Sequence, residues 1–342
     1  MSRSTTNINK SRSVTTGHIR ENVVLAPFTV YSIGGPARYF VEARAGEEIR
    51  EAVAFGRDKG VPFFILGAGS NILVSDKGFP GIVIHVGGGE IGVRGETIRA
   101  EAGVKMAALV AAASKASLTG FEWGIGIPGS VGGSVRGNAG CFGGEVGDVV
   151  SRVDVLDTSD REVPVREFSS RDCEFGYRHS IFKAHPEWII LSVTFSLAGG
   201  DADMIRERII SITRARTEKQ DIGTKSCGCI FKNVSWDAAG GKESLLGRFP
   251  EYLEIADLPN IPAAFLIDRA GLKGERAGNA VISPKSSFLS SFLCLLCCAS
   301  SCHVSFREVR CSGRPNHYIK IFFKKISPSF IFELMRINVN CG

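Results

Sequence analysis

The stretch GIGIPGSVGGSVRGNAGCFGG, from Gly124 to Gly144, decides the fold, because nine of its 21 residues are glycine. Two shorter glycine-dense stretches precede it, YSIGGPA at 31–37 and LGAGSN at 66–71. Glycine lets a backbone turn through positive φ and approach a ligand closely, and amide groups turned into such a loop hold anions. A single loop of this kind is usually a tight turn. Three in one part of the chain predict a site for a ligand that carries phosphate.

The glycine spacing excludes two common phosphate motifs. No GxGxxG precedes a predicted helix, as a Rossmann fingerprint requires, and no GK[ST] follows the glycines, as in a P-loop. The loops therefore indicate a phosphate site of another type.

Apolar spacing around the loops predicts alternating helices and strands. Residues 47–60 carry apolar side chains at helical spacing, whereas residues 150–157 and 189–197 alternate with period two, as half-buried strands do. Further strands are expected at 62–66, 82–86 and 96–103, and further helices at 104–118 and 204–217. Such a mixture predicts an α/β fold, with one unit that ends near residue 199 and a second that begins with the last helix.

Charge separates the ends of the chain from its body. The 342 residues hold 41 Lys and Arg against 35 Asp and Glu, a net charge of +6. Residues 1–20 carry +4 and residues 286–342 carry +5, so residues 21–285 carry −3. With 44% hydrophobic and 22% charged residues, the composition excludes disordered and fibrous classes. An acidic body without a basic face argues against a nucleic-acid partner.

Both ends also differ from the body in composition. Residues 1–21 are rich in Ser, Thr and Arg and lack an apolar core, which predicts a disordered leader or an organelle-targeting segment, not a secretory signal. Residues 286–342 hold six of the ten cysteines and only two of the forty glycines, as in a cysteine-rich module, a metal site, or sequence not native to the fold. Zinc-site spacing is missing and the apolar run Phe288–Cys298 is too short to span a bilayer, so we expect neither metal nor a membrane helix.

Five motifs together resemble one enzyme family. IGGPA, LGAGSN and GIPGSVGG…GNAG are followed by FGYRHSIFK at 175–183 and SCGCIFKN at 226–233, in the order and spacing of the UDP-N-acetylenolpyruvoylglucosamine reductases. The short link after FGYRHSIFK resembles the branch of the family without an extra substrate loop. The resemblance implies an α/β fold in which residues 22–199 form an FAD-binding module of two α/β subdomains. A smaller α/β substrate-binding domain would follow at 200–285.

The resemblance implies FAD as the cofactor and NADPH as the reductant. NADPH would reduce the flavin, which would pass hydride to the enolpyruvyl double bond of a UDP-sugar. Two sets of residues match the family's FAD site, the first along the pyrophosphate and the second along the flavin: Gly67, Ala68, Gly69, Ser70 and Asn71, then Ile127, Pro128, Gly129, Ser130 and Gly133.

Two residues match the family's catalytic positions. Arg178 matches the arginine that stabilises negative charge beside the substrate carboxylate, a role that suits an always-protonated guanidinium. Without the motif, the residues favour a surface ion pair of Arg178 with Glu174. Cys229 stands where most members carry a proton-donating serine, and a thiol with a pKa of about 8.5 is a competent general acid at neutral pH. Without the motif, a buried and inert Cys229 is an equal alternative.

Lys219 and Asn233 match the family's substrate-binding positions, Lys219 for the diphosphate and Asn233 for the UDP-sugar. From the residues alone, they are a solvated lysine at a helix end and an asparagine in a turn. Nearby departures from the family pattern are Asn260 for a lysine, Val234 for a proline, and Ala264 and Phe265 for Gly-Trp.

The largest departure from the family follows Lys285. The family continues there with a helix and a terminal stretch that holds a catalytic acid, whereas this chain reads SSFLSSFLCLLCCASSCHV. Glu333 is the acid near the end, and the catalytic role is not transferred to it. We interpret the break as a frameshift or untranslated sequence in the gene model, and we expect such a product to bind FAD but to reduce little or no substrate.

The leading hypothesis is an NADPH- and FAD-dependent reductase of UDP-N-acetylglucosamine enolpyruvate in peptidoglycan synthesis. It would act as a monomer in a bacterial cytoplasm or a plastid stroma. The alternatives are a catalytically impaired FAD-binding protein and another FAD-linked oxidoreductase. The latter is disfavoured because such enzymes have no reason to carry both FGYRHSIFK and SCGCIFKN.

Overall fold

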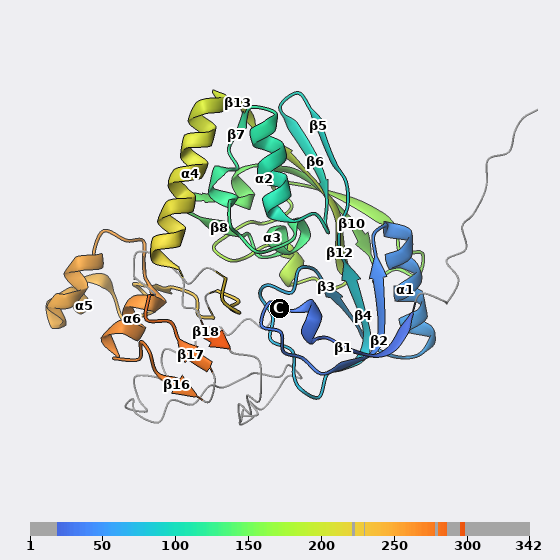
Figure 1. The fold of residues 1–342 in the computed structure, drawn as a ribbon, viewed down its shortest axis with the longest axis horizontal. Helices are drawn as coiled ribbons and strands as arrows, with labels where there is room; N and C mark the ends of the chain where they lie inside the picture. Colours follow the sequence, from blue (N-terminus) through green and yellow to red (C-terminus); the bar gives the residue numbers. More distant parts are fainter. Residues whose placement is uncertain (1–18, 221–222, 229, 278–279, 286–294, 298–342) are drawn as a thin grey trace, which may run out of the picture.

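A computed structural model gives the fold of residues 19–220, 223–228, 230–277, 280–285 and 295–297. Two sheets and the helices beside them form the larger part, and a long helix leads from it into a smaller C-terminal region that begins at Gly223 (Figure 1).

Sheet A is mixed and has the strand order β1-β2-β4-β3. Its strands are β1 (Arg20–Val24), β2 (Pro36–Ala43), β3 (Phe63–Leu66) and β4 (Phe79–Val86). Strand β1 runs antiparallel to β2, whereas β2 and β3 run parallel to β4. Helix α1 (Gly46–Asp58) joins β2 to β3 and buries Ile49, Ala52 and Val53, as the apolar spacing of residues 47–60 predicts.

Sheet B is antiparallel throughout and has the order β11-β10-β12-β6-β5. Its strands are β5 (Ile91–Arg94), β6 (Thr97–Glu101), β10 (Val150–Asp157), β11 (Val165–Ser169) and β12 (Trp188–Ser196). The two predicted period-two segments are its neighbouring strands β10 and β12. Ile189 and Ile190 are both buried, so both faces of β12 are covered there. Helix α2 (Met106–Lys115) follows β6 and buries Met106, Leu109 and Val110.

Nine short elements lie between the strands of the larger part, and four of them lie wholly or partly in the long glycine-rich stretch. In chain order, they are η2 (Ala26–Phe28), β7 (Leu118–Thr119), η3 (Glu122–Gly124), α3 (Val131–Arg136), β8 (Gly140–Cys141), β9 (Gly144–Glu145), η4 (Val146–Asp148), η5 (Ile181–Lys183) and β13 (Ala198–Gly199). Strands β8 and β9 form a hairpin, and β7 pairs with β13.

Helix α4 (Ala202–Lys219) carries the chain from the sheets to the C-terminal region (Figure 1). The carboxylate of Asp201 caps it, because Oδ1 accepts hydrogen bonds from the amides of Asp203 and Met204, both at 2.9 Å. Ile205 and Ile212 are buried, as the predicted helix at 204–217 requires. Across the described ranges, no helix is both long and apolar enough to cross a membrane.

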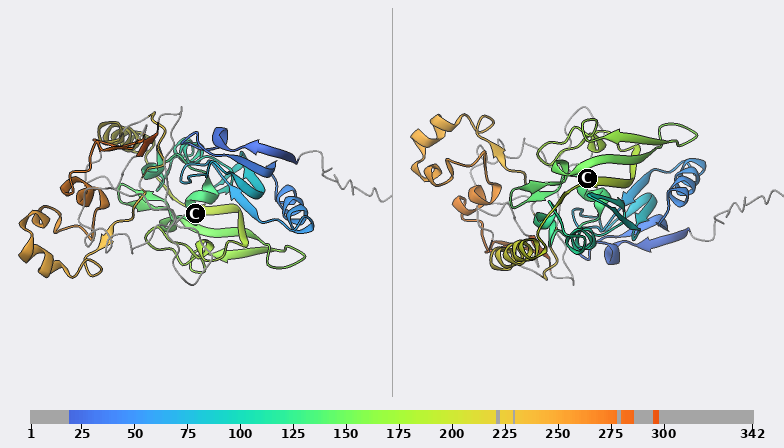
Figure 2. Two further views of the ribbon diagram at one scale, coloured as in Figure 1. Left: turned by 90° about the horizontal axis from the view of Figure 1, so that it is seen from below. Right: turned by 90° about the horizontal axis from the view of Figure 1, so that it is seen from above.

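The C-terminal region has a small core of its own. Its elements are β14 (Val234–Ser235), α5 (Lys242–Arg248), η6 (Pro250–Ile255), β15 (Asn260–Ile261), α6 (Ala263–Arg269), β16 (Arg276–Ala277), β17 (Ala280–Ile282) and β18 (Leu295–Cys297). The core is formed by Val234, Trp236, Tyr252, Ile255, Ile261 and Phe265. Figure 2 shows this region at one end of the molecule, with sheet A at the other end in both views.

Several strands, among them β1, β2 and β18, lie where the sequence predicts none. Strand β1 begins at Arg20, inside the predicted leader, and the Arg20 guanidinium pairs with Glu42 at 2.7 Å. Strand β2 buries Ala37 and Phe40 in a stretch that was predicted as a loop and an unassigned segment. Strand β18 comes from the predicted tail and pairs with β17. The sheets therefore extend past both predicted boundaries, at residues 21 and 286.

The C-terminal core provides the first test. Phe265 is fully buried, and its ring meets the Tyr252 ring edge-on, with 5.1 Å between the centroids. We expect Phe265→Ala to lower the local free energy of opening by about 3–5 kcal/mol, because losing the ring leaves a cavity. Hydrogen–deuterium exchange of the amides of η6 and α6 measures this change. Leu253→Ala is the control, since Leu253 is 63% exposed in the same region; equal losses in both variants would contradict this packing.

Candidate active site

The second and third glycine loops meet at the carboxyl end of β3. Residues 67–71 follow β3 directly, and residues 127–133 lead into α3. A Cβ atom on Gly67 would lie 2.5 Å from Ser130 Oγ, and a Cβ atom on Gly129 would lie 3.6 Å from Ser70 Oγ. The two sets of residues predicted along FAD therefore lie against one another.

The first glycine loop supports this arrangement from sheet A. The amide of Gly35 donates to Ser75 O at 2.9 Å, and the amide of Val30 donates to Gly69 O at 3.0 Å. Gly69 has a φ of +61°, and a Cβ atom there would collide with the carbonyl oxygen of Phe28. Position 69 therefore requires glycine for two reasons, the left-handed backbone and the close approach of residues 28–30.

Loop 67–71 offers its amide groups to a ligand. The amides of Ala68, Gly69, Ser70 and Asn71 donate no hydrogen bond to any described residue. Ala68 and Asn71 are exposed, and so is Gly133 on the facing segment. Amides without an internal partner suit the oxygens of a pyrophosphate, and the glycines leave free the space that a Cβ would fill. This geometry fits the FAD pyrophosphate that the motifs predict here.

The facing segment is fixed to the layer of sheet B. Ser130 is buried and caps α3, with its Oγ accepting from the amide of Gly133 at 3.5 Å. The amide of Val131 donates to Val104 O at 2.8 Å, and the amide of Met106 donates to Gly129 O at 2.9 Å. The start of α2 thus holds the backbone predicted to lie along the flavin.

Arg178 occupies a tight turn between β11 and η5. Gly176 and His179 exchange two backbone hydrogen bonds, of 3.1 and 2.9 Å, and Arg178 between them has a φ of +54°. A positive φ is uncommon for a residue other than glycine. The guanidinium donates to Asn138 O at 3.4 Å and to Gly140 O at 3.0 Å. Arg178 is therefore fixed beside the segment that follows α3.

Asn138 joins the Arg178 turn to the β8–β9 hairpin. Its side chain is fully buried, and Nδ2 donates to Gly176 O at 3.0 Å and to Glu145 Oε1 at 2.8 Å. Its Oδ1 accepts from the amide of Gly147 at 2.9 Å. Because both ends of the amide are used, Asn138 fixes the turn and the hairpin relative to one another.

Arg178 belongs to a group of four cations, in which Lys183 lies near the charges of Arg136, Arg178 and Lys232. Burial, and then the charges of Lys232, Arg136 and Arg178, lower the pKa of Lys183 to about 8. Burial and the charge of Arg178 also lower the pKa of Lys232. Within the described ranges, no ion pair includes any of these four cations, and the alternative pair of Arg178 with Glu174 does not form. A half-buried group of like charges favours an anionic ligand.

Arg216 is a candidate that the sequence analysis missed. It is buried on α4, donates to Cys141 Sγ at 2.7 Å and lies 5.2 Å from the centroid of the Phe142 ring. Burial raises the pKa of the Cys141 thiol, while the charges of Arg216 and Arg178 oppose that rise. The sequence does contain a signal for this residue. Arg216 follows Ile212 by four residues, so it lies on the inward face of the predicted helix, where an arginine is unusual.

The C-terminal region reaches the site through Asn233 and Cys227. The amide of Asn233 donates to the hydroxyl of Tyr177 at 3.2 Å, and its Oδ1 accepts from the amide of Ala263 at 3.2 Å. The predicted substrate-binding asparagine therefore also fixes the start of α6 beside the Arg178 turn. Cys227 Sγ donates to Ile72 O at 3.5 Å, next to loop 67–71.

The structure says less about two of the predicted site residues, Lys219 and Cys229. Lys219 is half-buried at the last position of α4, which ends beside the C-terminal region. Cys229 lies outside the described residues, so its role as proton donor stays a prediction.

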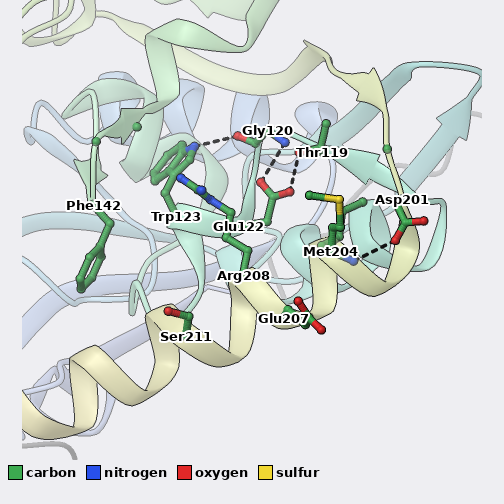
Figure 3. Close-up of a pocket in the computed structure, with 14 residues that line it drawn as sticks. Thr119, Gly120, Glu122, Trp123, Phe142, Asp201, Met204, Glu207, Arg208 and Ser211 are labelled. Carbon is green, nitrogen blue, oxygen red and sulfur yellow. Dashed lines mark hydrogen bonds between the residues drawn. The ribbon is translucent and has the colours of Figure 1, made fainter.

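A cavity is lined by Phe142, Gly143 and Gly144 at the end of the third glycine stretch, and none of the ten residues predicted along FAD lines it. It has a volume of about 750 Å³ and lies between α4 and the segment that holds η3 and the β8–β9 hairpin (Figure 3). Trp123, Phe142 and Met204 give it an apolar lining. The Glu122 carboxylate in its wall accepts from Thr119 Oγ1 at 2.6 Å and from the amide of Gly120 at 2.9 Å, so it serves the fold.

Two family models match this chain. Residues 37–163 match an FAD binding domain, and residues 220–289 match the C-terminal domain of UDP-N-acetylenolpyruvoylglucosamine reductase. The first match contains all ten residues predicted along FAD. Together with the glycine loops, it defines the chain as a flavin-binding oxidoreductase.

Similar proteins identify the family more closely. The UDP-N-acetylenolpyruvoylglucosamine reductase of Clostridium novyi is 33% identical over 270 residues, 79% of each chain. That of Carboxydothermus hydrogenoformans is 37% identical over 78% of this chain and 80% of its own. The crystal structure of the enzyme from Thermus caldophilus superposes with a TM-score of 0.64 at 30% identity, over 83% of this chain and 90% of the other. The chain belongs to the UDP-N-acetylenolpyruvoylglucosamine reductase family, as its motifs predict.

The contact at Gly69 provides a test of the FAD site. We expect Gly69→Ala to lose at least about nine tenths of FAD binding, because the new Cβ collides with the backbone that supports the loop. Flavin absorbance of the purified protein and titration of the apoprotein with FAD measure the loss. Gly95→Ala is the matched control, since Gly95 has a similar φ of +56° but no atom within 4 Å of its Cβ position. Loss of FAD in both variants would assign the effect to backbone strain alone.

Proposed function

We propose that this chain reduces UDP-N-acetylglucosamine enolpyruvate to UDP-N-acetylmuramate in peptidoglycan synthesis, with FAD as cofactor and NADPH as reductant. The observation that carries the proposal is the group of four cations, unpaired by any described acid, beside the glycine loops. The substrate brings a carboxylate and a diphosphate, which are the anions that such cations recognise. When bound, FAD supplies the electrons that reduce the enolpyruvyl double bond.

In this proposal, Arg178 stabilises the charge that develops beside the substrate carboxylate. A guanidinium has five N–H groups, and the described residues use two of them, through Asn138 O and Gly140 O. The remaining donors serve the carboxylate as it gains charge. Because the two carbonyls fix the guanidinium beforehand, little reorganisation is needed during the reaction.

We propose Cys229 as the acid that delivers the proton to the substrate carbon. Support comes from its neighbour Cys227, which lies against loop 67–71 through Ile72 O. A thiol with a pKa of about 8.5 is protonated at neutral pH and releases its proton more readily than a hydroxyl.

Lys219 and Asn233 are proposed to bind the substrate, Lys219 through the diphosphate and Asn233 through the UDP-sugar. Lys219 ends α4 where the C-terminal region begins, and Asn233 touches Tyr177 in the Arg178 turn. We further propose that the protein acts as a monomer, in a bacterial cytoplasm or a plastid stroma.

A second candidate function is FAD binding without turnover of the UDP-sugar. It is favoured by the sequence after the family match, which ends at residue 289. Residues 286–342 offer only Glu308 and Glu333 as acids, and neither stands in a motif that resembles the family's terminal stretch. The two candidates differ in one step, the reoxidation of the reduced enzyme by substrate.

Anaerobic half-reactions distinguish these candidates. We expect NADPH to bleach the flavin absorbance of the purified protein, and UDP-N-acetylglucosamine enolpyruvate to restore it. Arg178→Met should slow the second step by about 10²–10³, because a fixed charge-stabilising donor is lost. Arg171→Met is the control, since Arg171 is an exposed arginine close in the sequence. Bleaching without recovery in the unsubstituted protein would favour the second candidate, and a colourless protein would exclude both.

Variants of Cys229 test the proton donor. We expect Cys229→Ser to retain the second half-reaction, because a hydroxyl also delivers a proton. Cys229→Ala should reduce the flavin normally with NADPH and then stall. Stopped-flow absorbance measures both steps in each variant. Full turnover by Cys229→Ala would remove this thiol from the mechanism.

A further inference from the structure

We propose that Lys183 is a positioning residue that holds the Arg178 turn in its active geometry and adds a positive charge beside it. The proposal rests on the proposed function, because it concerns how the same site receives an anionic substrate.

The first support is the contact between the two residues. Lys183 Nζ donates to the carbonyl oxygen of Arg178 at 2.8 Å. Arg178 has a φ of +54°, in a region that a side-chain-bearing residue occupies only where its surroundings hold it there. The ammonium group therefore stabilises the backbone of this turn residue, while the guanidinium contacts with Asn138 and Gly140 hold its side chain.

The second support is that Lys183 itself stands on a fixed base. It ends η5, whose preceding residue Ser180 is fully buried and donates through Oγ to Arg136 O at 2.8 Å. Phe182 is also buried, and its ring meets the Phe168 ring edge-on at 5.5 Å between centroids. Because η5 is anchored in this way, the hydrogen bond from Lys183 holds the carbonyl of Arg178 in a defined position.

The charges that face Lys183 come from three separate elements. Arg136 lies on α3, Arg178 on the turn, and Lys232 in the C-terminal region. Farther along the chain, His185 and Glu187 bind one another at 2.8 Å. Burial and the three cations lower the pKa of Lys183 to about 8, below the usual value for lysine. The positive charge is therefore present below that pH and is lost as the pH rises through it.

Substrate binding should reverse this shift. The carboxylate and diphosphate bring negative charge to the cations, which raises the pKa of a neighbouring ammonium. The charge of Lys183 then titrates near pH 8 in the free enzyme but not in the substrate complex. We expect kcat/KM for the UDP-sugar to fall above about pH 8, while kcat stays nearly constant.

The experiment compares pH profiles in a Cys229→Ser background, because the Cys229 thiol would titrate in the same range. In that background, Lys183→Met should lower kcat/KM at pH 7 by about tenfold to hundredfold and remove the fall above pH 8. Lys183→Arg should keep most of the activity and shift the fall to higher pH, since a guanidinium stays charged. Lys115→Met, at an exposed position on α2, is the control and should leave the profile unchanged.

A second readout does not depend on turnover. Reductive methylation with ¹³C-formaldehyde labels the lysines, and the resonance that is missing from Lys183→Arg belongs to Lys183. We expect this resonance to titrate with a midpoint near 8 and to shift upward when UDP-N-acetylglucosamine enolpyruvate is added.

The outcomes separate the two proposals. A fall in kcat/KM that persists unchanged in Lys183→Met and Lys183→Arg would assign it to another group, such as Lys232, and overturn the role of Lys183. Equal kcat/KM at pH 7 for Lys183→Met and the control would do the same. If the unsubstituted protein is not reoxidised by the UDP-sugar, the proposed function fails instead, and a Lys183 resonance with an ordinary midpoint would then also remove the charge proposed here.

Discussion

The close backbone contact at Gly69 is the constraint on which the candidate site depends. Only glycine accepts the left-handed φ and also lets the carbonyl of Phe28 approach so closely. This contact ties loop 67–71 to the segment before the first glycine loop, while Gly67 lies against Ser130 on the other side. Sheets A and B share one hydrophobic core of side chains, whereas loop 67–71 at its edge is held by close backbone approach. A pocket lined by backbone offers amide donors in fixed positions, which suits a ligand whose binding energy lies largely in its phosphates.

A second constraint is electrostatic. Whereas the contact at Gly69 holds the fold together, the repulsion between like charges at the site lowers the stability of the folded protein. Four cations lie close together and no described acid pairs with them: Arg136, Arg178, Lys183 and Lys232. Their mutual repulsion raises the electrostatic free energy of the folded protein. The fold supplies carbonyl oxygens as partial compensation, from Asn138 and Gly140 to Arg178 and from Arg178 to Lys183. Sites that hold such like charges trade stability for binding, because the ligand supplies the missing opposite charge.

The sequence was informative where structure is local. The glycine loops and the helices at 47–60 and 204–217 depend on neighbouring residues, and both helices were predicted with nearly correct bounds. What it missed depends on distant partners. Strand β1 forms because residues Arg20 to Val24 pair with β2, and strand β18 forms because it pairs with β17. The cation group could not be predicted for the same reason, since its members are brought together only by the fold.

The distribution of charge shows why net charge alone is a poor guide to the ligand. Residues 21–285 carry −3, yet the described site concentrates four cations within that acidic body. At physiological salt, charges in water are screened beyond about 8 Å. An acidic surface therefore does not attract polyanions, and its charges have little effect on a half-buried group of cations. A small anionic ligand that enters the site meets the local cations at short range, where screening is weak. An acidic body with a half-buried cationic site therefore favours nucleotide-linked substrates over nucleic acids, even though both are anions.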